Sequence, residues 1–108
     1  MGLSSSLGIK REDRRKMTFE WDEDKNAGNK RKHKISFELA KHVFDDPNVL
    51  EIYDFEHSVT EDRYIALGMV GDILYVVYTE RKENIRLISA RLATETERRL
   101  YYDNNCYC

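Results

Sequence analysis

The chain has 108 residues, 35% of them charged, and a formal net charge of −2. This length fits a single domain with one modest core, and no apolar run approaches the roughly 20 residues that a membrane span requires. The first 16 residues are polar and basic and lack the apolar segment of a secretory signal, so we expect a cytoplasmic protein without a membrane partner.

The N-terminal third predicts a flexible extension, a short strand and a helix. Residues 1–16 are polar and charged with little to bury, which is typical of a flexible extension. A domain is expected over residues 17–102, and its first strand over residues 19–21, where apolar and polar side chains alternate. Asp22 can cap a helix that ends in the basic group 30–34, since basic side chains suit a helix C-terminus.

A second helix is predicted to cover one face of a sheet. Ser36 can cap this helix, and the chain must leave it before Pro47. A strand is then expected over residues 49–54. The apolar stripe that the helix would place on the sheet consists of Phe37, Ala40, Val43 and Phe44.

Three runs rich in β-branched and aromatic residues predict an antiparallel meander at the centre of the chain. Gly71 and Asp72 fit a two-residue hairpin loop with glycine first, where a positive φ is needed, and this loop pairs Val70 with Ile73. A looser polar connection follows the second run. The three runs are residues 62–70, 73–79 and 85–91.

The register assumed for this meander decides which side chains share a face. With Arg81 opposite Asn84, period-2 alternation places Arg63 and Arg91 on one face. They would lie at opposite ends of it, about six residues or roughly 20 Å apart at ~3.3 Å per residue. The same face is predicted to carry Ile65, Leu67, Met69, Leu74, Val76, Tyr78, Leu87 and Ser89, and the opposite face Tyr75 and Val77.

A capping box opens the last predicted helix. Thr94 and Glu97 have the T-x-x-E spacing, and the helix is expected to run through Tyr102. Residues 103–108 are predicted to be a tail whose two cysteines are too close for an ordinary disulfide and are a weak metal signal. The predicted order is β-α-α-β-β-β-β-α, an α+β fold with an antiparallel sheet and helices packed on it.

Lys32 and His33 are the first candidate site residues. Histidine titrates near neutrality and can act as a general acid or base, and a neighbouring lysine can stabilise negative charge. The alternative is an exposed histidine in the basic end of a helix, where its charge complements the helix dipole.

Arginines are the second group of candidates, because a guanidinium stays charged and can hold a phosphate through two parallel hydrogen bonds. Arg63 follows Glu61 closely, so a structural ion pair is its alternative explanation. Arg91 lies beside Ser89 on a mostly apolar face, and we favour it for that reason. The candidate substrate-binding residues are Arg81, Ser89 and Tyr78, the last grouped with Trp21 and Tyr101 as aromatic rings that either stack on bases or belong to the core.

Charge is unevenly distributed along the chain. Residues 45–62 contain seven acidic and no basic residues, whereas the segments on either side are richer in lysine and arginine. The acidic segment and the lack of a clear helix-turn-helix argue against direct DNA binding by this chain. An ordinary solvated surface of mixed charge is the alternative to a basic binding surface.

A series of short motifs follows one another along the chain: Phe19-Glu20-Trp21-Asp22, Lys32-His33 with Ser36-Phe37, Val43-Phe44-Asp45-Asp46-Pro47, Glu61-Asp62-Arg63-Tyr64, Ile88-Ser89-Ala90-Arg91 and Glu97-Arg98. In this order they resemble the BrnT toxin family of bacterial type II toxin–antitoxin systems. The resemblance implies a RelE-like α+β fold, metal-independent ribonuclease activity that halts translation, and neutralisation by a BrnA-type antitoxin with a DNA-binding domain. Operator DNA would then be reached only through the antitoxin. The residues that match the family's patterns are Lys32, His33, Arg63, Ser89, Arg91 and Glu97.

The leading hypothesis is an endoribonuclease without metal or cofactor. His33 would take the proton of an RNA 2′-hydroxyl, and Arg91 and Lys32, with Arg63, would stabilise the charge on the pentavalent phosphate. The alternative is a non-catalytic module whose basic side chains bind an acidic antitoxin and contribute to operon autoregulation, since groups that bind phosphate also bind carboxylates.

Overall fold

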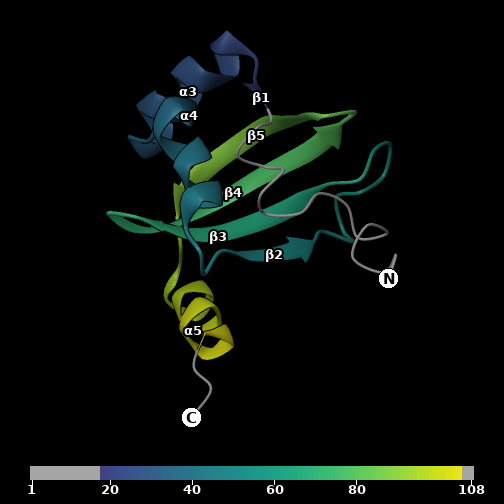
Figure 1. Cartoon of the computed structure of the whole chain (residues 1–108). Helices are drawn as coiled ribbons and strands as arrows, with labels where there is room; N and C mark the ends of the chain where they lie inside the picture. The colour runs from purple at the N-terminus through teal and green to yellow at the C-terminus, as the bar shows by residue number, and fades with distance from the viewer. Residues whose placement is uncertain (1–17, 106–108) are drawn as a thin grey trace.

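The structure is a computed structural model that describes residues 18–105. The predicted extension over residues 1–16 and both cysteines lie outside the described residues. The predicted α+β class and element order are confirmed. The elements are β1 (Thr18–Glu20), α3 (Glu23–His33), α4 (Phe37–Ala40) with the 3₁₀ helix η1 (Lys41–Asp45), β2 (Leu50–Tyr53), β3 (Tyr64–Val70), β4 (Asp72–Arg81), β5 (Asn84–Leu92) and α5 (Glu95–Asn104) (Figure 1).

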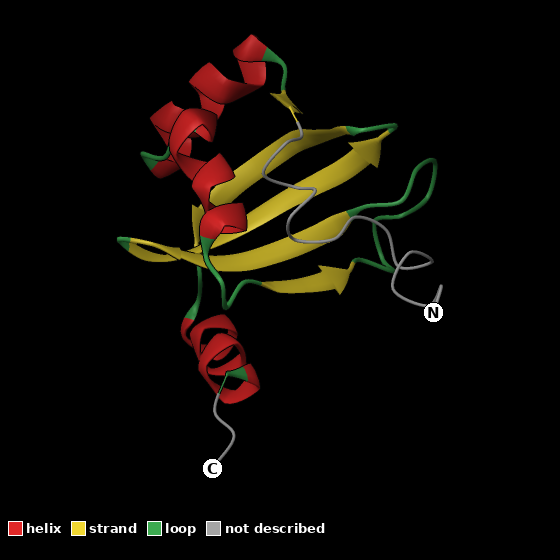
Figure 2. Cartoon of the chain, viewed as in Figure 1, coloured by secondary structure: helices red, strands yellow, loops and turns green. Residues whose placement is uncertain are grey.

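The strands form one five-stranded sheet in the order β1-β5-β4-β3-β2 (Figure 2). The predicted antiparallel meander is confirmed as β3, β4 and β5, and β2 adds antiparallel to β3. The sheet is mixed rather than wholly antiparallel, because β1 pairs parallel to β5 with Phe19 opposite Ile85. None of the described helices is long and apolar enough to cross a membrane.

The predicted register between β3 and β4 is wrong by one residue. Val70 pairs with Asp72 and Met69 with Ile73, so Gly71 alone makes the reversal, with a φ of 75°. Glycine adopts this φ without a steric penalty, so the predicted need for a positive φ at Gly71 is confirmed although the register is not. A shift of one residue moves every β3 side chain to the other face relative to β4.

A bulge in β5 produces a second correction. The strand starts in the predicted register, with Arg81 opposite Asn84, and Leu87 pairs with Tyr78. Ser89 then pairs with Val77, which leaves one extra residue in β5 and reverses its alternation. Arg91 therefore lies opposite Tyr75 and shares its face, whereas the sequence analysis placed these two side chains on opposite faces.

The helices α4 and η1 cover one face of the sheet, here called the covered face. The predicted stripe of Phe37, Ala40, Val43 and Phe44 is buried there, at 0 to 3% exposure. Close approach is possible because β3 carries Gly68 at the contact: a Cβ on this residue would lie 2.7 Å from the Val43 Cβ. The other buried side chains of this core are Ile35, Ala66, Leu74, Val76, Tyr78, Ile85, Leu87 and Ala90.

Helix α3 is held by two buried asparagines instead of an apolar stripe. Asn26 accepts a hydrogen bond from the Phe37 N–H (2.8 Å), which joins α3 to α4. Asn29 donates to the carbonyls of Ile35 (2.9 Å) and Ala90 (2.8 Å), and its side-chain oxygen accepts from the Ala90 N–H (3.2 Å). Because these groups are buried and mutually satisfied, a polar helix can dock firmly on the edge of β5.

Helix α5 packs at the end where β5 finishes, apart from α3 and α4 (Figure 1). Its buried Tyr101 forms a small second core with Leu67 and Ile73. The Tyr101 hydroxyl donates to the Asp46 carboxylate (2.5 Å), which also accepts from the Met69 N–H (2.8 Å) and so ties α5, η1 and β3 together. The helix runs to Asn104, two residues beyond the predicted end, so the first residues of the predicted tail are helical.

Candidate active site

The sheet face opposite α4 carries arginines from β4, from β5 and from the residue before β3, and is called the arginine face. The Arg91 guanidinium lies over the Tyr75 ring. Arg86 pairs with Thr79, which is four residues after Tyr75 on β4, so both arginines lie on the same face. Arg81 continues the same alternation on β4. Arg63 precedes β3, and its carbonyl accepts from the Asp54 N–H (2.9 Å), so the ladder continues and directs this side chain to the same face.

The corrected registers bring the predicted arginines closer together than the sequence analysis placed them. Arg91 lies opposite Tyr75, and Tyr75 lies opposite Leu67, which is four residues from Arg63 along the chain. The separation along the strands is therefore roughly 13 Å at ~3.3 Å per residue, not about 20 Å. This spacing is still too great for both guanidinium groups to hold one phosphate.

Arg91 is held by an ion pair with two parallel hydrogen bonds. Its Nη1 and Nη2 donate to the two carboxylate oxygens of Glu97, each at 2.9 Å, and Nη1 also donates to the Leu92 carbonyl (3.0 Å). The Tyr75 ring lies beneath the guanidinium, with its centroid 3.8 Å from Cζ. Such planar, bidentate pairing fixes the orientation of the group as well as its charge.

This pairing leaves one side of the Arg91 guanidinium available. Of the five N–H groups of an arginine, three donate to Glu97 and to the Leu92 carbonyl. The Nε–H and the remaining Nη2–H point the same way, and the other contact of the guanidinium within residues 18–105 is with Tyr75. Two parallel donors of this kind match two oxygens of a phosphate.

The charges of the Arg91–Glu97 pair stabilise each other. The hydrogen bonds to Glu97 raise the pKa of Arg91 above its ordinary value. Burial pushes the pKa of Glu97 upward, but hydrogen bonds from Arg91 and Thr94 outweigh it and hold that pKa below its ordinary value. Both side chains keep some exposure, 33% for Arg91 and 21% for Glu97, so the pair is accessible from solvent.

Glu97 belongs to the predicted capping box of α5, which the structure confirms. Its carboxylate accepts from the Thr94 N–H (2.8 Å), and its own N–H donates to the Thr94 hydroxyl (3.2 Å). The helix is further joined to the β3–β4 hairpin by an ion pair between Arg98 and Asp72 (2.5 Å). The same glutamate therefore caps the helix and holds Arg91.

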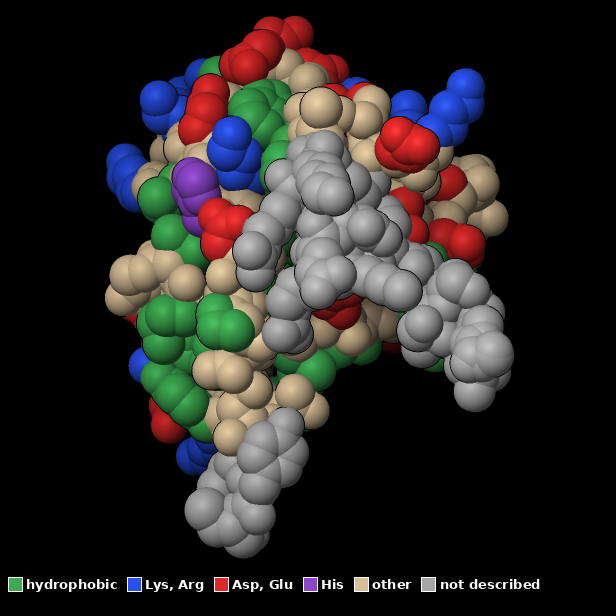
Figure 3. Space-filling model, viewed as in Figure 1, with side chains coloured by type: hydrophobic (Ala, Val, Ile, Leu, Met, Phe, Trp, Pro, Cys, Tyr) green, Lys and Arg blue, Asp and Glu red, His purple; other side chains and the backbone are tan. Residues whose placement is uncertain are grey.

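Lys32 and His33 form the last turn of α3, as predicted. The Asn29 bonds fix α3 against the backbone of Ala90, and His33 follows Asn29 by four residues, about 6 Å along the helix axis. Through Asn29, α3 is therefore anchored to β5 at Ala90, the residue before Arg91. The side chains of Lys32 and His33 make no hydrogen bond or ion pair with another residue among 18–105. Basic and acidic side chains alternate on the side seen in Figure 3.

Arg81 and Arg63 lie at the other end of the arginine face. Arg81 pairs with Glu61 (3.3 Å), the carboxylate that the sequence analysis considered for Arg63. The half-buried Arg63 side chain makes no ion pair within the described part of the chain. Ser89 is half-buried between the two ends, opposite Val77. The predicted arginines thus form two groups on this face, Arg91 at one end and Arg63 with Arg81 at the other.

Tyr78 does not belong to this face. It is 1% exposed on the covered face, where its ring stacks on Tyr64 with centroids 5.5 Å apart and its hydroxyl donates to Glu51 (3.2 Å). The one-residue register shift and the bulge explain the error, since both reverse the predicted faces. A ring buried in this way cannot stack on a base, so the predicted substrate contact of Tyr78 is corrected. Trp21, half-buried against Phe37, and buried Tyr101 are also core residues.

Sequence reasoning did not select Arg86 or Tyr75 for this face. Arg86 pairs with Thr79, at the strand level of Arg63, and donates to Glu20 on β1 (3.0 Å). Regular alternation along β5 predicts that Arg86 and Arg91 lie on opposite faces. The bulge between them places both on the arginine face. In residues 18–105, no group of three or more histidine, cysteine, aspartate or glutamate side chains is placed to hold a metal ion.

Comparisons with known proteins identify the family and a similar fold. A family model described as the ribonuclease toxin BrnT of type II toxin–antitoxin systems matches residues 21–97. The crystal structure of the ribonuclease toxin BrnT from Brucella abortus has a similar fold: the TM-score is 0.58 at 23% sequence identity, over 73% of this chain and 99% of that one. No curated protein matches the chain. The family match spans most of the sequence motifs, so the predicted family resemblance is confirmed.

Proposed function

Since this chain belongs to the BrnT family of ribonuclease toxins of type II toxin–antitoxin systems, we propose that it is a metal-independent endoribonuclease that cuts RNA and thereby halts translation. The observation that supports this most directly is the state of Arg91. Glu97 and Tyr75 orient its guanidinium, and one pair of parallel donors remains available for a phosphate.

In the proposed reaction the RNA supplies its own nucleophile. His33 accepts the proton of a 2′-hydroxyl, and the 2′-oxygen attacks the adjacent phosphorus. A bond forms between the 2′-oxygen and phosphorus, and the bond from phosphorus to the 5′-oxygen breaks. The products are a 2′,3′-cyclic phosphate and a 5′-hydroxyl, whose oxygen takes a proton from water. DNA lacks this nucleophile and should stay intact.

In this proposal each basic side chain has a role that depends on its distance from the scissile phosphate. Arg91 and Lys32 stabilise the charge that develops on the phosphate, because preorganised donors act most strongly where negative charge accumulates. Ser89, on the same strand, donates a hydrogen bond to the sugar–phosphate backbone. Arg63 and Arg81 contact neighbouring phosphates, since the register places them too far from Arg91 to share one.

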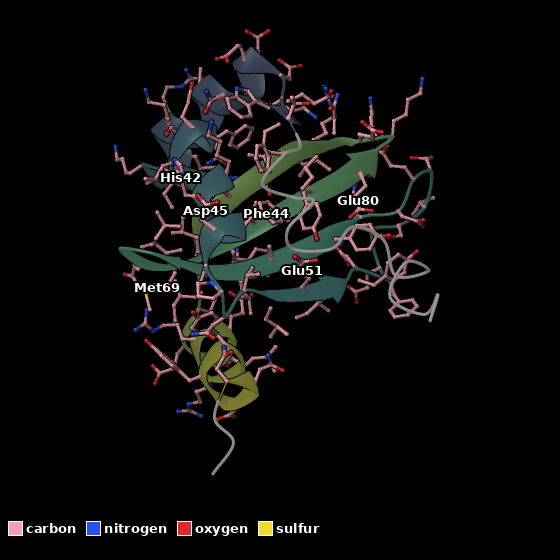
Figure 4. All side chains as sticks on the ribbon, in the orientation of Figure 1. His42, Phe44, Asp45, Glu51, Met69 and Glu80 are labelled. Atoms are coloured by element: carbon pink, nitrogen blue, oxygen red, sulfur yellow. The ribbon has the colours of Figure 1, made fainter. Side chains whose placement is uncertain are left out.

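The direct test incubates purified protein with RNA in EDTA and follows cleavage on a gel. We expect cleavage by the wild-type chain, no cleavage of an RNA with a 2′-deoxy nucleotide at the cut, and a loss of at least 100-fold in rate for His33→Ala and Lys32→Ala. His42→Ala is the matched control, because His42 lies on η1 beside its own partner Asp45 (2.9 Å; Figure 4). Intact RNA at stoichiometric amounts of folded protein would refute the proposal.

The proposed partner is a BrnA-like antitoxin with a DNA-binding domain, through which this chain reaches operator DNA in the cytoplasm. Membership of a type II family supports a protein antitoxin, and the acidic segment 45–62 argues against direct contact with DNA. A gel-shift with operator DNA tests this: the chain alone should give no shift, and the toxin–antitoxin complex should give one.

A second candidate function is a non-catalytic module that only binds the antitoxin. The observation in its favour is that Arg91 already holds a carboxylate, the group that an acidic partner would offer. Lys32→Ala combined with His33→Ala separates the two functions. Loss of growth arrest with antitoxin binding retained supports catalysis, whereas loss of both supports the binding module.

A further inference from the structure

We propose that Glu97 is the positioning residue of the active site: it turns the Arg91 guanidinium so that the Nε–H and the outer Nη2–H face the RNA phosphate. This inference rests on the proposed function and assigns a role to a carboxylate that does not itself touch the substrate. Without Glu97, the arginine would still be present and charged, but it would no longer be held in one orientation.

The geometry of the Arg91–Glu97 pair indicates which N–H donors of Arg91 can bind the substrate. Glu97 binds the end of the guanidinium, because its two oxygens accept separately from Nη1 and Nη2. The second Nη1–H is used by the Leu92 carbonyl. Within residues 18–105 this leaves the side formed by Nε and Nη2, and the Tyr75 ring, with its centroid 3.8 Å from Cζ, restricts rotation of the guanidinium plane. A bidentate site for two phosphate oxygens results.

Glu97 can act in this way because it is itself immobilised. The Thr94 N–H donates to the same Oε1 that accepts from Arg91, so the carboxylate is fixed from two directions. Helix α5 is anchored to the rest of the protein through Tyr101 and Asp46. A functional side chain held by a second layer of hydrogen bonds keeps the geometry that catalysis requires, and a displacement of about 1 Å can cost 100-fold in rate.

The substitution Glu97→Gln separates this role from helix capping. Glutamine also serves in a capping box, so the Thr94 contact is retained. Its NH₂ group, however, faces an N–H donor of Arg91 in place of a carboxylate oxygen, so one arm of the bidentate pair is lost. The variant should keep the fold and leave Arg91 free to reorient.

The test measures cleavage kinetics on one RNA substrate in EDTA for matched variants. For Glu97→Gln we expect kcat to fall roughly 10- to 100-fold, with KM unchanged or lower, because a negative charge near the RNA is removed. In an Arg91→Ala background, Glu97→Gln should cause no further loss, since it acts through Arg91. Glu95→Gln is the control: Glu95 lies in the same turn, in an exposed pair with Arg99 at 3.6 Å, and should retain wild-type kinetics.

A second readout keeps this inference separate from the proposed function. The NMR signals of the Arg91 Nη–H groups, which donate to Glu97 and to the Leu92 carbonyl, should be resolved and slow to exchange in the wild-type chain and should broaden in Glu97→Gln. If the wild type cleaves RNA, Arg91→Ala cleaves it with a lowered kcat, and Glu97→Gln keeps the full kcat, the positioning role is overturned and the ribonuclease assignment stands. If the wild type cleaves no RNA, the function is wrong, and an unchanged Arg91 signal in Glu97→Gln then overturns the positioning role as well.

Discussion

Gly68→Ala should destabilise this protein because η1 and β3 touch at Gly68. A Cβ at this position would lie 2.7 Å from the Val43 Cβ, 2.9 Å from the Val43 carbonyl oxygen and 3.0 Å from its Cα. These are backbone and near-backbone atoms, so no side-chain rotation relieves the contact. Overpacking of this kind costs about 1–3 kcal/mol, against a gain of roughly 0.5–1 kcal/mol from removing a flexible glycine.

The expected net loss for Gly68→Ala is therefore about 1–2 kcal/mol of unfolding free energy, measured by urea denaturation at neutral pH. A thermal melt should show a fall of roughly 4–8 °C per kcal/mol. Adding Val43→Ala should bring no rescue, because alanine keeps the Cβ, the carbonyl and the Cα that make the contact.

The matched control for this prediction is Gly28→Ala in α3. A Cβ there meets only Arg31 Nη2 at 3.8 Å, an ordinary contact. This substitution should stabilise the protein by about 0.5–1 kcal/mol, because alanine is the better helix former. Opposite signs for the two substitutions are the central expectation. A neutral or stabilised Gly68→Ala variant would refute the argument that η1 packs directly on the β3 backbone.

Three further predictions concern the buried hydroxyl of α5, the pH dependence of stability and the arginine face. Tyr101→Phe removes the hydrogen bond to the Asp46 carboxylate (2.5 Å) and should lower the unfolding free energy by about 1.5–3 kcal/mol in urea titrations. Because the pKa of Glu97 is lowered on folding, its contribution to stability is present above its unfolded pKa and is lost as pH falls through the folded value. Urea midpoints between pH 6 and pH 3 should thus decline more steeply for the wild type than for Glu97→Gln, and parallel curves would contradict this. Arg86→Ala should weaken RNA binding and reduce the salt slope of the affinity by about 0.7, measured by fluorescence anisotropy, whereas Arg99→Ala on α5 should leave the slope unchanged.

Local sequence signals were sufficient where an element depends on its own residues. Ser36 and Thr94 cap their helices as expected, because a cap needs only a side-chain oxygen near the first free N–H groups. The apolar stripe from Phe37 to Phe44 is buried as its spacing predicts. Helix α3 shows the limit of this reasoning, since Asn26 and Asn29 dock it through partners that are distant in sequence.

The sequence by itself determined the α+β class, the order of the elements, the family and most of the side chains considered for the site. Which of those side chains lie together was decided only by the tertiary structure. Register and bulge position depend on contacts between strands and with the helices, such as Gly68 against Val43 and Asn29 against Ala90. A shift of one residue changes the face of every side chain in a strand without changing any local preference. For this reason Arg91 could be selected from the sequence, but its pairing with Glu97 over Tyr75 could not.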